Sequence, residues 1–175
     1  MGQTMNRDYF LKTDRMGFSK WRTEDLPLAQ ILWGDPAVTR FISAGGSFSQ
    51  GDIENRLKKE CENEERCGVQ YWPIFERTSG ELIGCCGLRP YGERQYELGF
   101  HLRPKFWGCG FASEAARAVM GYAFDGLQAR SLFAGHHPCN ENSAKVLKKL
   151  GFVYVAEEFY EPTGLNHPSY ILNHP

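Results

Sequence analysis

The sequence predicts an α/β (α+β) protein with one mixed, mostly antiparallel sheet flanked by helices. Three consecutive strand-like stretches, residues 69–76, 82–88 and 95–102, are joined by turns of hairpin length. A strand, a glycine-rich turn and a helix then follow one another between residues 97 and 123, which is typical of a crossover to a parallel strand. The chain has 175 residues and no repeat or linker, so a single domain over residues 1–175 is predicted.

The elements before the glycine-rich turn are four strands and three helical segments. Residues 15–21 form the first predicted strand, and the three hairpin strands come later. Thr23 is expected to cap a first helix, and Asp35, followed by proline, restarts it. Ser49 begins a capping box of a polar helix that ends at about residue 65.

The elements after the turn are two helices and three strands, which bring the predicted sheet to seven strands. Asn140 is expected to cap the second of these helices, and Gly151 to end it in a left-handed conformation. The predicted ranges are helix 113–124, strand 131–136, helix 140–150, and strands 152–159 and 169–172.

The composition is typical of globular proteins, with 42% hydrophobic and 23% charged residues. A formal net charge of −1 gives no electrostatic reason to expect nucleic acid or an anionic membrane as a partner. The N-terminal segment has neither the apolar region of a secretory signal nor a myristoylation pattern, and no apolar run approaches a membrane span. A cytoplasmic protein, monomer or homodimer, is predicted.

The six cysteines show no CxxC spacing. Cys85 and Cys86 are adjacent in a predicted strand and therefore face opposite ways. The cysteines are expected to be small buried apolar residues rather than bridges or metal ligands. His136, His137 and Cys139 also follow a strand and alternate in direction, so no metal site is predicted.

The turn from Trp107 to Ala112 reads WGCGFA and leads from a strand into a helix. Glycines allow close backbone approach, and a helix N-terminus presents free N–H groups, so this turn is expected to bind a phosphate. A Walker loop is excluded because no Gly-Lys-Ser/Thr occurs. A dinucleotide fingerprint fits poorly, since it needs a small apolar residue where Ser113 stands and an acid at the end of the next strand.

The register Trp107-x-x-Gly110-x-Ala112 resembles the pyrophosphate loop Q/R-x-x-G-x-G/A of the GNAT superfamily of N-acetyltransferases, with tryptophan where Gln or Arg is usual. The run WGxGxASEA, the segment LWGDPAVTRFI and the pair NENS and LKKLGF resemble the RimJ/RimL-type branch, which acetylates N-termini of ribosomal proteins. Together these motifs extend from about Phe18 to Leu172, in the order and spacing of that branch.

The resemblance implies acetyl-CoA as co-substrate, held in a slot where two strands of the sheet splay apart. It implies that the loop amides hold the pyrophosphate and that the end of the central strand pairs with the pantetheine and polarises the thioester. Asn140 and Ser143 are implied to contact the same cofactor. The cofactor-binding residues expected are therefore Phe100, His101, Leu102, Trp107, Gly108, Cys109, Gly110, Phe111, Ala112, Asn140 and Ser143.

For catalysis, Glu97 falls where many members of the superfamily place the general base. A charged residue at a strand end is the structural alternative, and His101 or a water chain are alternative bases. Many members protonate the leaving thiolate with a tyrosine, but Leu147 stands at that position, so the resemblance implies Ser143. Direct transfer is expected, without an acyl intermediate on Cys109.

The predicted function is direct transfer of an acetyl group from acetyl-CoA to a primary amine, either a protein N-terminus or a small molecule such as a polyamine, an aminoglycoside or an amino-acid-like amine. Residues 41–53 and 161–168 are expected to form the acceptor walls. The alternative is a non-catalytic acyl-CoA-binding module or sensor on the same fold. The presence of Glu97 and Ser143 favours the enzyme.

Overall fold

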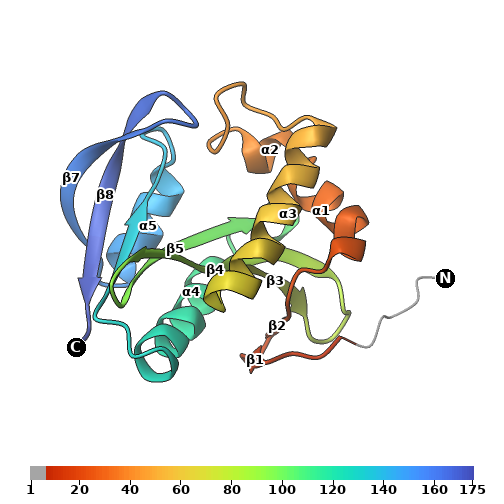
Figure 1. Cartoon of the computed structure of the whole chain (residues 1–175), viewed down its shortest axis with the longest axis horizontal. Coiled ribbons are helices and arrows are strands. Elements are labelled where there is room, and N and C mark those ends of the chain that lie inside the picture. The colour runs from red at the N-terminus through yellow and green to blue at the C-terminus, as the bar shows by residue number, and fades with distance from the viewer. Residues whose placement is uncertain (1–6) are drawn as a thin grey trace.

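The computed structural model describes residues 7–175. Residues 1–6, which carry part of the segment predicted to lack a signal or a myristoylation site, lie outside the described residues. The described chain forms an eight-stranded sheet in the order β1-β2-β3-β4-β5-β6-β8-β7. Helices lie against both faces of this sheet, with α4 on the side opposite α1 and α3 (Figure 1).

The strands are β1 (Leu11–Lys12), β2 (Met16–Phe18), β3 (Tyr71–Glu76), β4 (Leu82–Gly92), β5 (Gln95–Leu102), β6 (Ser131–Gly135), β7 (Val153–Tyr160) and β8 (Leu165–Asn173). The helices are α1 (Leu26–Trp33), α2 (Pro36–Thr39), α3 (Gln50–Cys67), α4 (Phe111–Gly121) and α5 (Glu141–Lys149). Short 3-10 turns occur at Thr23–Asp25 and Pro104–Phe106, and a π-helical turn at Tyr122–Gly126 extends α4.

The neighbouring strands are antiparallel except β5 and β6, which run parallel on either side of the α4 crossover. This confirms the predicted mixed, mostly antiparallel sheet. All seven predicted strands are present, and the two-residue β1 at one edge adds an eighth. Such a short edge strand has too few residues for a detectable alternation in the sequence.

Several element boundaries differ from the prediction. The strand expected over residues 15–21 is only the three residues of β2, whereas the strand expected over 169–172 is the nine-residue β8. The helix expected from residue 113 begins two residues earlier, because Gly110 adopts a φ of +79° and is itself the N-cap of α4. The glycine both ends the turn and starts the helix.

The helix caps follow local sequence closely. Ser49 Oγ accepts from the Asp52 N–H at 3.1 Å, and Asp52 accepts from the Ser49 N–H at 2.8 Å, so the predicted capping box is present. Asp35 also accepts from a backbone N–H, at 2.9 Å. Thr23 is not the cap that was predicted, because the helical turn begins at Thr23 itself and follows Arg22.

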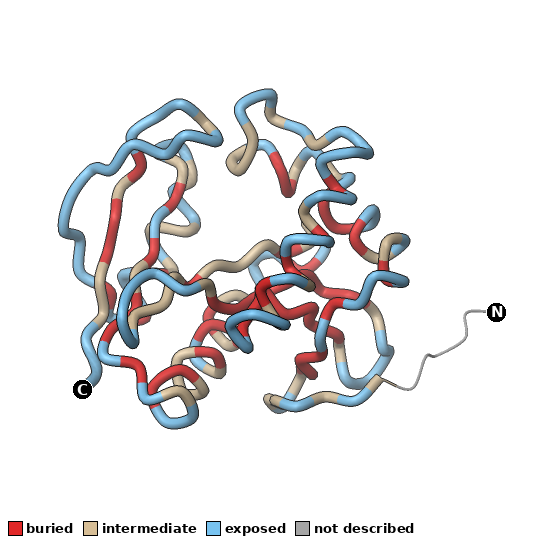
Figure 2. Tube along the Cα trace, in the orientation of Figure 1, coloured by how far each residue is buried: buried red, intermediate tan, exposed pale blue. Residues whose placement is uncertain are grey.

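Two hydrophobic clusters, one on each face, hold the helices to the sheet. The first packs α4 and α5 against the sheet around Leu98, Val119 and Leu147. The second packs α1 and α3 against the other face around Trp33 and Ile53. Buried residues gather in the central strands, whereas every residue of β7 is exposed (Figure 2).

The cysteines are free thiols, and only some of them are buried. Cys86 belongs to the first cluster and Cys85 to the second, which confirms that they face opposite ways. Cys67, Cys109 and Cys139 are exposed. The prediction that the cysteines are buried apolar residues is therefore wrong for these three, which lie at a helix end and in turns rather than in the core strands.

Candidate active site

The parallel strands β5 and β6 separate after a short paired stretch. Gln95–Glu97 pairs with Ser131–Phe133, and the remainder of β6 continues along β8. The predicted splaying of two strands is present: the pairing of β5 with β6 ends at Glu97, whereas β6 stays paired with β8 along its whole length. The two strands were predicted to diverge only past Phe100. A cleft of about 710 Å³ opens beside the separated strands, within the usual size range of cofactor and substrate sites.

The glycine-rich turn between β5 and α4 forms part of the cleft wall. Gly108 and Gly110 have φ angles of +73° and +79°, which glycine adopts without strain. The first N–H groups of α4 have no partners within the helix, and the positive end of its dipole lies here. Trp107 donates from Nε1 to the Leu102 carbonyl at 2.8 Å and so ties the turn to the end of β5.

Arg15, from the turn between β1 and β2, holds the outer side of this loop. Its Nη1 donates to the Cys109 carbonyl at 3.0 Å, and its Nε donates to Glu114 at 2.7 Å. The guanidinium also lies 4.0 Å from the centroid of the Phe111 ring. A contact between residues so distant in the sequence is not visible in a local motif, and it was not predicted.

Glu97 lies at the last residue of β5 that pairs with β6, where the cleft begins. It is half-buried, and its Oε1 accepts a hydrogen bond from the Tyr71 hydroxyl at 3.0 Å. Arg89 is its partner across β4 and β5. Burial, and then the charge of Glu97, raise the pKa of Tyr71 well above its ordinary value, so the phenol is neutral and donates.

Glu60, on α3, is a fully buried carboxylate that faces this part of the sheet. Its Oε1 accepts from Arg56 at 2.9 Å and from Arg89 at 3.1 Å, while Oε2 accepts from the Tyr71 N–H at 2.8 Å. Burial raises the pKa of Glu60, but the two guanidinium groups and the backbone N–H outweigh it and hold the pKa below its ordinary value. Glu60 thus anchors Arg56 and Arg89 beside the cleft.

His101 lies on the same side of β5 as Glu97. Its Nδ1 accepts from Trp33 Nε1 at 3.2 Å, and the Cys85 thiol lies 3.6 Å from the same atom. Burial, together with Arg56 and Arg89, lowers the pKa of His101 well below its ordinary value. The neutral tautomer that this contact assigns carries its proton on Nε2, so His101 offers the cleft a donor rather than a base.

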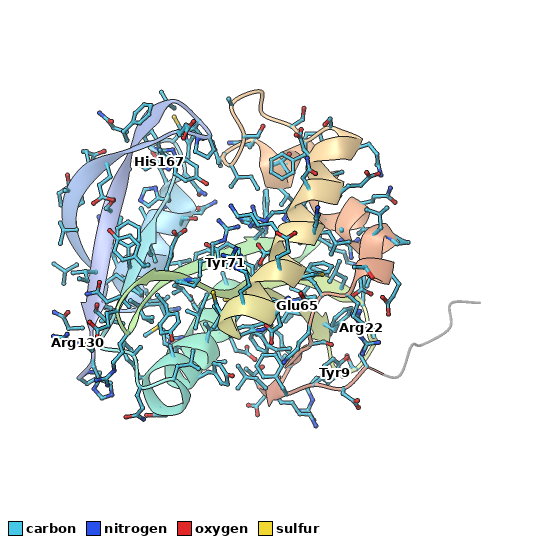
Figure 3. All side chains as sticks on the ribbon, viewed as in Figure 1. Tyr9, Arg22, Glu65, Tyr71, Arg130 and His167 are labelled. Carbon is cyan, nitrogen blue, oxygen red and sulfur yellow. The ribbon has the colours of Figure 1, made fainter. Side chains whose placement is uncertain are left out.

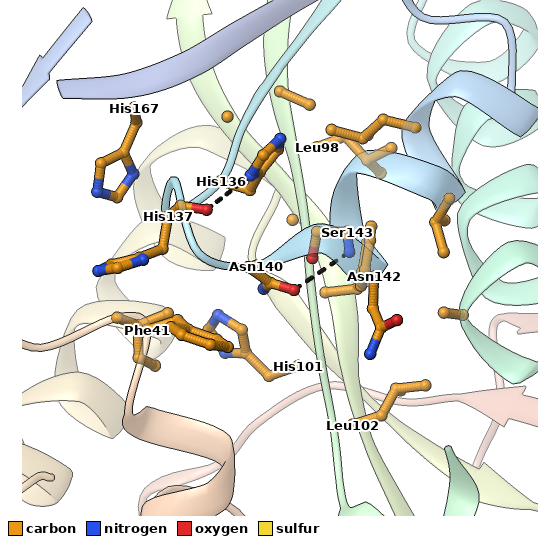
Figure 4. Close-up of a pocket in the computed structure, with 18 of the residues that line it drawn as sticks. Phe41, Leu98, His101, Leu102, His136, His137, Asn140, Asn142, Ser143 and His167 are labelled. Carbon is orange, nitrogen blue, oxygen red and sulfur yellow. Dashed lines mark hydrogen bonds between the residues drawn. The ribbon is translucent and has the colours of Figure 1, made fainter. Parts of the chain in front are cut away.

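The first turn of α5 also lines the cleft. The Asn140 Oδ1 accepts from the Ser143 N–H at 3.2 Å, which confirms the predicted cap and fixes the half-buried serine at the cleft wall (Figure 4). Leu147, one turn further on, is buried in the core. Ser143 is therefore the hydroxyl that this helix presents here.

The outer part of the cleft is aromatic and rich in histidine (Figure 4). His136 bonds the Tyr170 hydroxyl at 3.2 Å through Nε2. The rings of Phe41 and His137 lie 4.9 Å apart, and His167 contacts His137 edge-on. Burial and neighbouring histidines lower the pKa of His137 and of His167. Among the described residues, no group of His, Cys, Asp and Glu is arranged to hold a metal ion.

The structure brings the predicted site residues together, with one exception. Cys109 is exposed and does not line the cleft, although the turn that contains it does. The other predicted residues line it: Glu97, Phe100, His101, Leu102, Trp107, Gly108, Gly110, Phe111, Ala112, Asn140 and Ser143. The lining residues that were not singled out from the sequence include Arg56, Tyr71, Arg89 and Phe133.

A parallel strand pair that opens beside a glycine turn at a helix N-terminus defines an α/β protein with a cleft at the centre of its sheet. The model of the acetyltransferase (GNAT) domain family matches residues 15–153. The chain therefore belongs to the GNAT acetyltransferase family and is an acyltransferase.

Relatives and solved structures agree with this assignment. The chain is 30% identical over 154 residues to the uncharacterized protein YkkB of Bacillus subtilis, covering 86% of this chain and 88% of the relative. It is 27% identical to the uncharacterized N-acetyltransferase p20 of Bacillus licheniformis, covering 81% of each chain. A GNAT-family acetyltransferase from Bacillus anthracis superposes with a TM-score of 0.79 at 24% identity, over 93% of this chain and 97% of that one.

Structural neighbours also include enzymes that act on ribosomal proteins. The ribosomal-protein-S5-alanine acetyltransferase of Vibrio fischeri has a TM-score of 0.75 at 18% identity, covering 95% of this chain and 97% of that one. The ribosomal L7/L12 α-N-protein acetyltransferase RimL, in complex with coenzyme A, has a TM-score of 0.79 at 15% identity, covering 95% and 98%. At these identities the likeness shows a shared fold. No helix within residues 7–175 has the length and apolar character needed to cross a membrane.

Proposed function

We propose that the protein, as one catalytic domain, transfers an acetyl group from acetyl-CoA directly to a primary amine. The observation that carries this proposal is the cleft where β5 and β6 separate, with the glycine-rich turn and the first turn of α4 on its wall. The separated strands leave backbone groups of β5 free to pair with an extended chain such as pantetheine, and the turn offers N–H groups to a pyrophosphate.

The proposed cofactor contacts follow the geometry of the turn. The pyrophosphate binds the amides from Gly108 to Ala112, including that of Cys109, whose side chain does not line the cleft. The pantetheine runs along residues 100–102 of β5, and Asn140 and Ser143 contact it from α5. The coenzyme A complex of the structural neighbour RimL supports coenzyme A as the ligand class.

The proposed chemistry assigns the incoming amine to Glu97 and the leaving thiolate to Ser143. A primary amine reaches the site protonated, because free amines titrate far above neutral pH. Glu97, directly or through a water, accepts that proton, and the neutral nitrogen then attacks the thioester carbon. The carbon–sulfur bond breaks, and the second proton that nitrogen loses on becoming an amide passes to the departing thiolate, so that CoA leaves as the thiol. Ser143 donates a hydrogen bond to the departing thiolate. His101 is the weaker candidate for the base, because its contact with Trp33 assigns the Nε2-protonated form.

The experiment is a panel of amine acceptors assayed for release of CoA thiol and for the acetylated product. The panel contains a short peptide with a free N-terminus, spermidine, an aminoglycoside and a free amino acid. We expect CoA release that matches product formation for at least one of them. Tight binding of acetyl-CoA with no release for any acceptor would instead support the acyl-CoA-binding module or sensor.

A further inference from the structure

Tyr71 contacts the proposed base from a strand two positions away in the sheet. We propose that Tyr71 is a positioning residue for acetyl transfer: its hydroxyl donates to the Glu97 carboxylate and orients it, through a contact that requires glycine at position 99. This inference rests on the proposed function, in which Glu97 is the base. In this proposal Tyr71 acts through Glu97 and not on the reacting atoms.

The path of the Tyr71 side chain depends on two glycines. Tyr71 on β3 pairs with Gly87 on β4, and Gly87 pairs with Gly99 on β5, so the three residues lie in one row across the sheet. A Cβ at Gly99 would lie 2.3 Å from both Cζ and the hydroxyl oxygen of Tyr71. The phenol therefore crosses β4 where there is no side chain and reaches over the bare backbone of Gly99 to Glu97.

The Tyr71 ring is held firmly in this position. It is 3% exposed and lies near the middle of the molecule, beneath α3 (Figure 3). The Arg89 guanidinium lies 4.3 Å from the ring centroid, and Glu60 holds both Arg89 and the Tyr71 backbone N–H. A hydroxyl on a ring fixed in this way is pre-organised for its acceptor.

Charged and titratable groups surround Glu97 on several elements. Those that interact with it are Lys59 from α3, Tyr71 from β3, and Arg89 and Tyr91 from β4. The groups that interact with these neighbours in turn are Arg56 and Glu60 on α3, His101 on β5 itself and Glu158 on β7. Tyr71 is neutral among them, so loss of its hydroxyl removes a hydrogen bond from Glu97 without changing the charge of its surroundings.

The direct test is the titration of the Glu97 carboxyl by carbon-13 NMR, which needs no ligand. The signal is assigned by its loss in Glu97→Gln and followed against pH in wild type and Tyr71→Phe. We expect the titration midpoint to rise by about one pH unit in Tyr71→Phe, because the ionised carboxylate loses a donor. Tyr122→Phe removes a hydroxyl on the opposite face of the sheet and should leave the midpoint unchanged. An unchanged midpoint in folded Tyr71→Phe overturns the proposal.

A second variant tests the route through Gly99. We expect Gly99→Ala to displace the ring and to move the Glu97 midpoint in the same direction as Tyr71→Phe. The double variant should shift no further than Tyr71→Phe alone, because both changes act through one hydroxyl. Shifts that simply add would contradict the shared route.

The rate profile separates this inference from the proposed function. The rate profile is measured with whichever acceptor of the panel is acetylated. The acidic limb of kcat/KM should move to higher pH in Tyr71→Phe by the same amount as the titration midpoint of the Glu97 carboxyl. If Glu97→Gln leaves the profile unchanged, the assignment of the base is wrong. If Glu97→Gln changes the profile and Tyr71→Phe does not, only the positioning role is wrong.

Discussion

Glu97 lies on β5 and Ser143 on α5, so the proposed base and the proposed hydrogen-bond donor reach the cleft from different elements. Glu97 accepts from the Tyr71 hydroxyl, while Ser143 is held in the first turn of its helix by the Asn140 cap. This separation allows the carboxylate to serve the incoming amine and the hydroxyl to serve the leaving thiolate.

For the base, we predict that Glu97→Gln lowers kcat/KM by roughly a hundredfold, most strongly on the acidic limb, where the acceptor is most protonated. The amide keeps the size of the side chain but cannot take up the proton. The measurement is the rate profile against pH, with the exposed Glu157→Gln on β7 as the matched control. Superimposed profiles of wild type and Glu97→Gln would remove Glu97 from the mechanism.

For the leaving group, we predict that Ser143→Ala lowers kcat by about tenfold and leaves the dissociation constant of acetyl-CoA within about twofold of wild type. The hydroxyl acts on the thiolate that forms during the reaction, so ground-state binding changes little. Single-turnover rates and calorimetry separate the two quantities, with Ser79→Ala in the β3–β4 turn as control. An equal loss in both would assign Ser143 to cofactor binding alone.

Two elements give the site its shape: the glycine-rich turn with α4, and α3 with the strands beneath it. In the proposed function the turn supplies the anion-binding end of the cleft, and Arg15 holds the outer side of the turn. Helix α3 contributes Arg56 and, through Glu60, holds Arg89. Each element can be tested by a single change.

For the turn, we predict that Gly110→Asp weakens acetyl-CoA binding by at least about tenfold, because it adds a negative charge beside the pyrophosphate and a side chain at a φ of +79°. Calorimetry on the folded variant measures this. Gly80→Asp adds the same charge at a φ of +74° in the β3–β4 turn, outside the cleft lining, and should bind normally. Equal affinity in both variants would place the pyrophosphate elsewhere.

For α3, we predict that Glu60→Gln lowers the free energy of unfolding at pH 7 by about 3 kcal/mol, because two buried guanidinium groups lose their counter-charge. The folded pKa of Glu60 lies below its ordinary value of 4.5. Its carboxylate therefore stabilises the fold above that value, and the stabilisation is lost as the pH falls through the folded pKa.

Urea unfolding of wild type and Glu60→Gln at several pH values measures the difference in their free energies of unfolding. The difference in the free energy of unfolding should narrow as the pH falls from the ordinary value of 4.5 through the lower folded pKa of Glu60, where the wild-type carboxyl takes up its proton. Glu65→Gln, exposed on the same helix, is the control and should change stability by less than about 0.5 kcal/mol. A difference that stays constant with pH would mean that the charge of Glu60 is not the cause.

At the scale of the whole molecule, predictions from local pattern were the most successful. The capping box at Ser49 and the cap at Asn140 depend on residues three apart, and the order β3-β4-β5 follows from the turns that join these strands. The Tyr71–Glu97 contact depends on strands that meet only in the folded sheet. The burial of Glu60 was missed because a carboxylate on a polar helix is typical of a solvent-exposed face. Its burial depends on Arg56, Arg89 and the Tyr71 N–H, which reach it only in the folded protein.

The central claim is that both walls of the cleft meet around one cofactor, and a crystal structure of the protein with coenzyme A tests it most directly. The account predicts the pyrophosphate within hydrogen-bond distance of the amides from Gly108 to Ala112. It also predicts the pantetheine between β5 and β6, with its sulfur near Ser143. A pyrophosphate bound away from the glycine-rich turn, or a pantetheine outside the gap between β5 and β6, would contradict it.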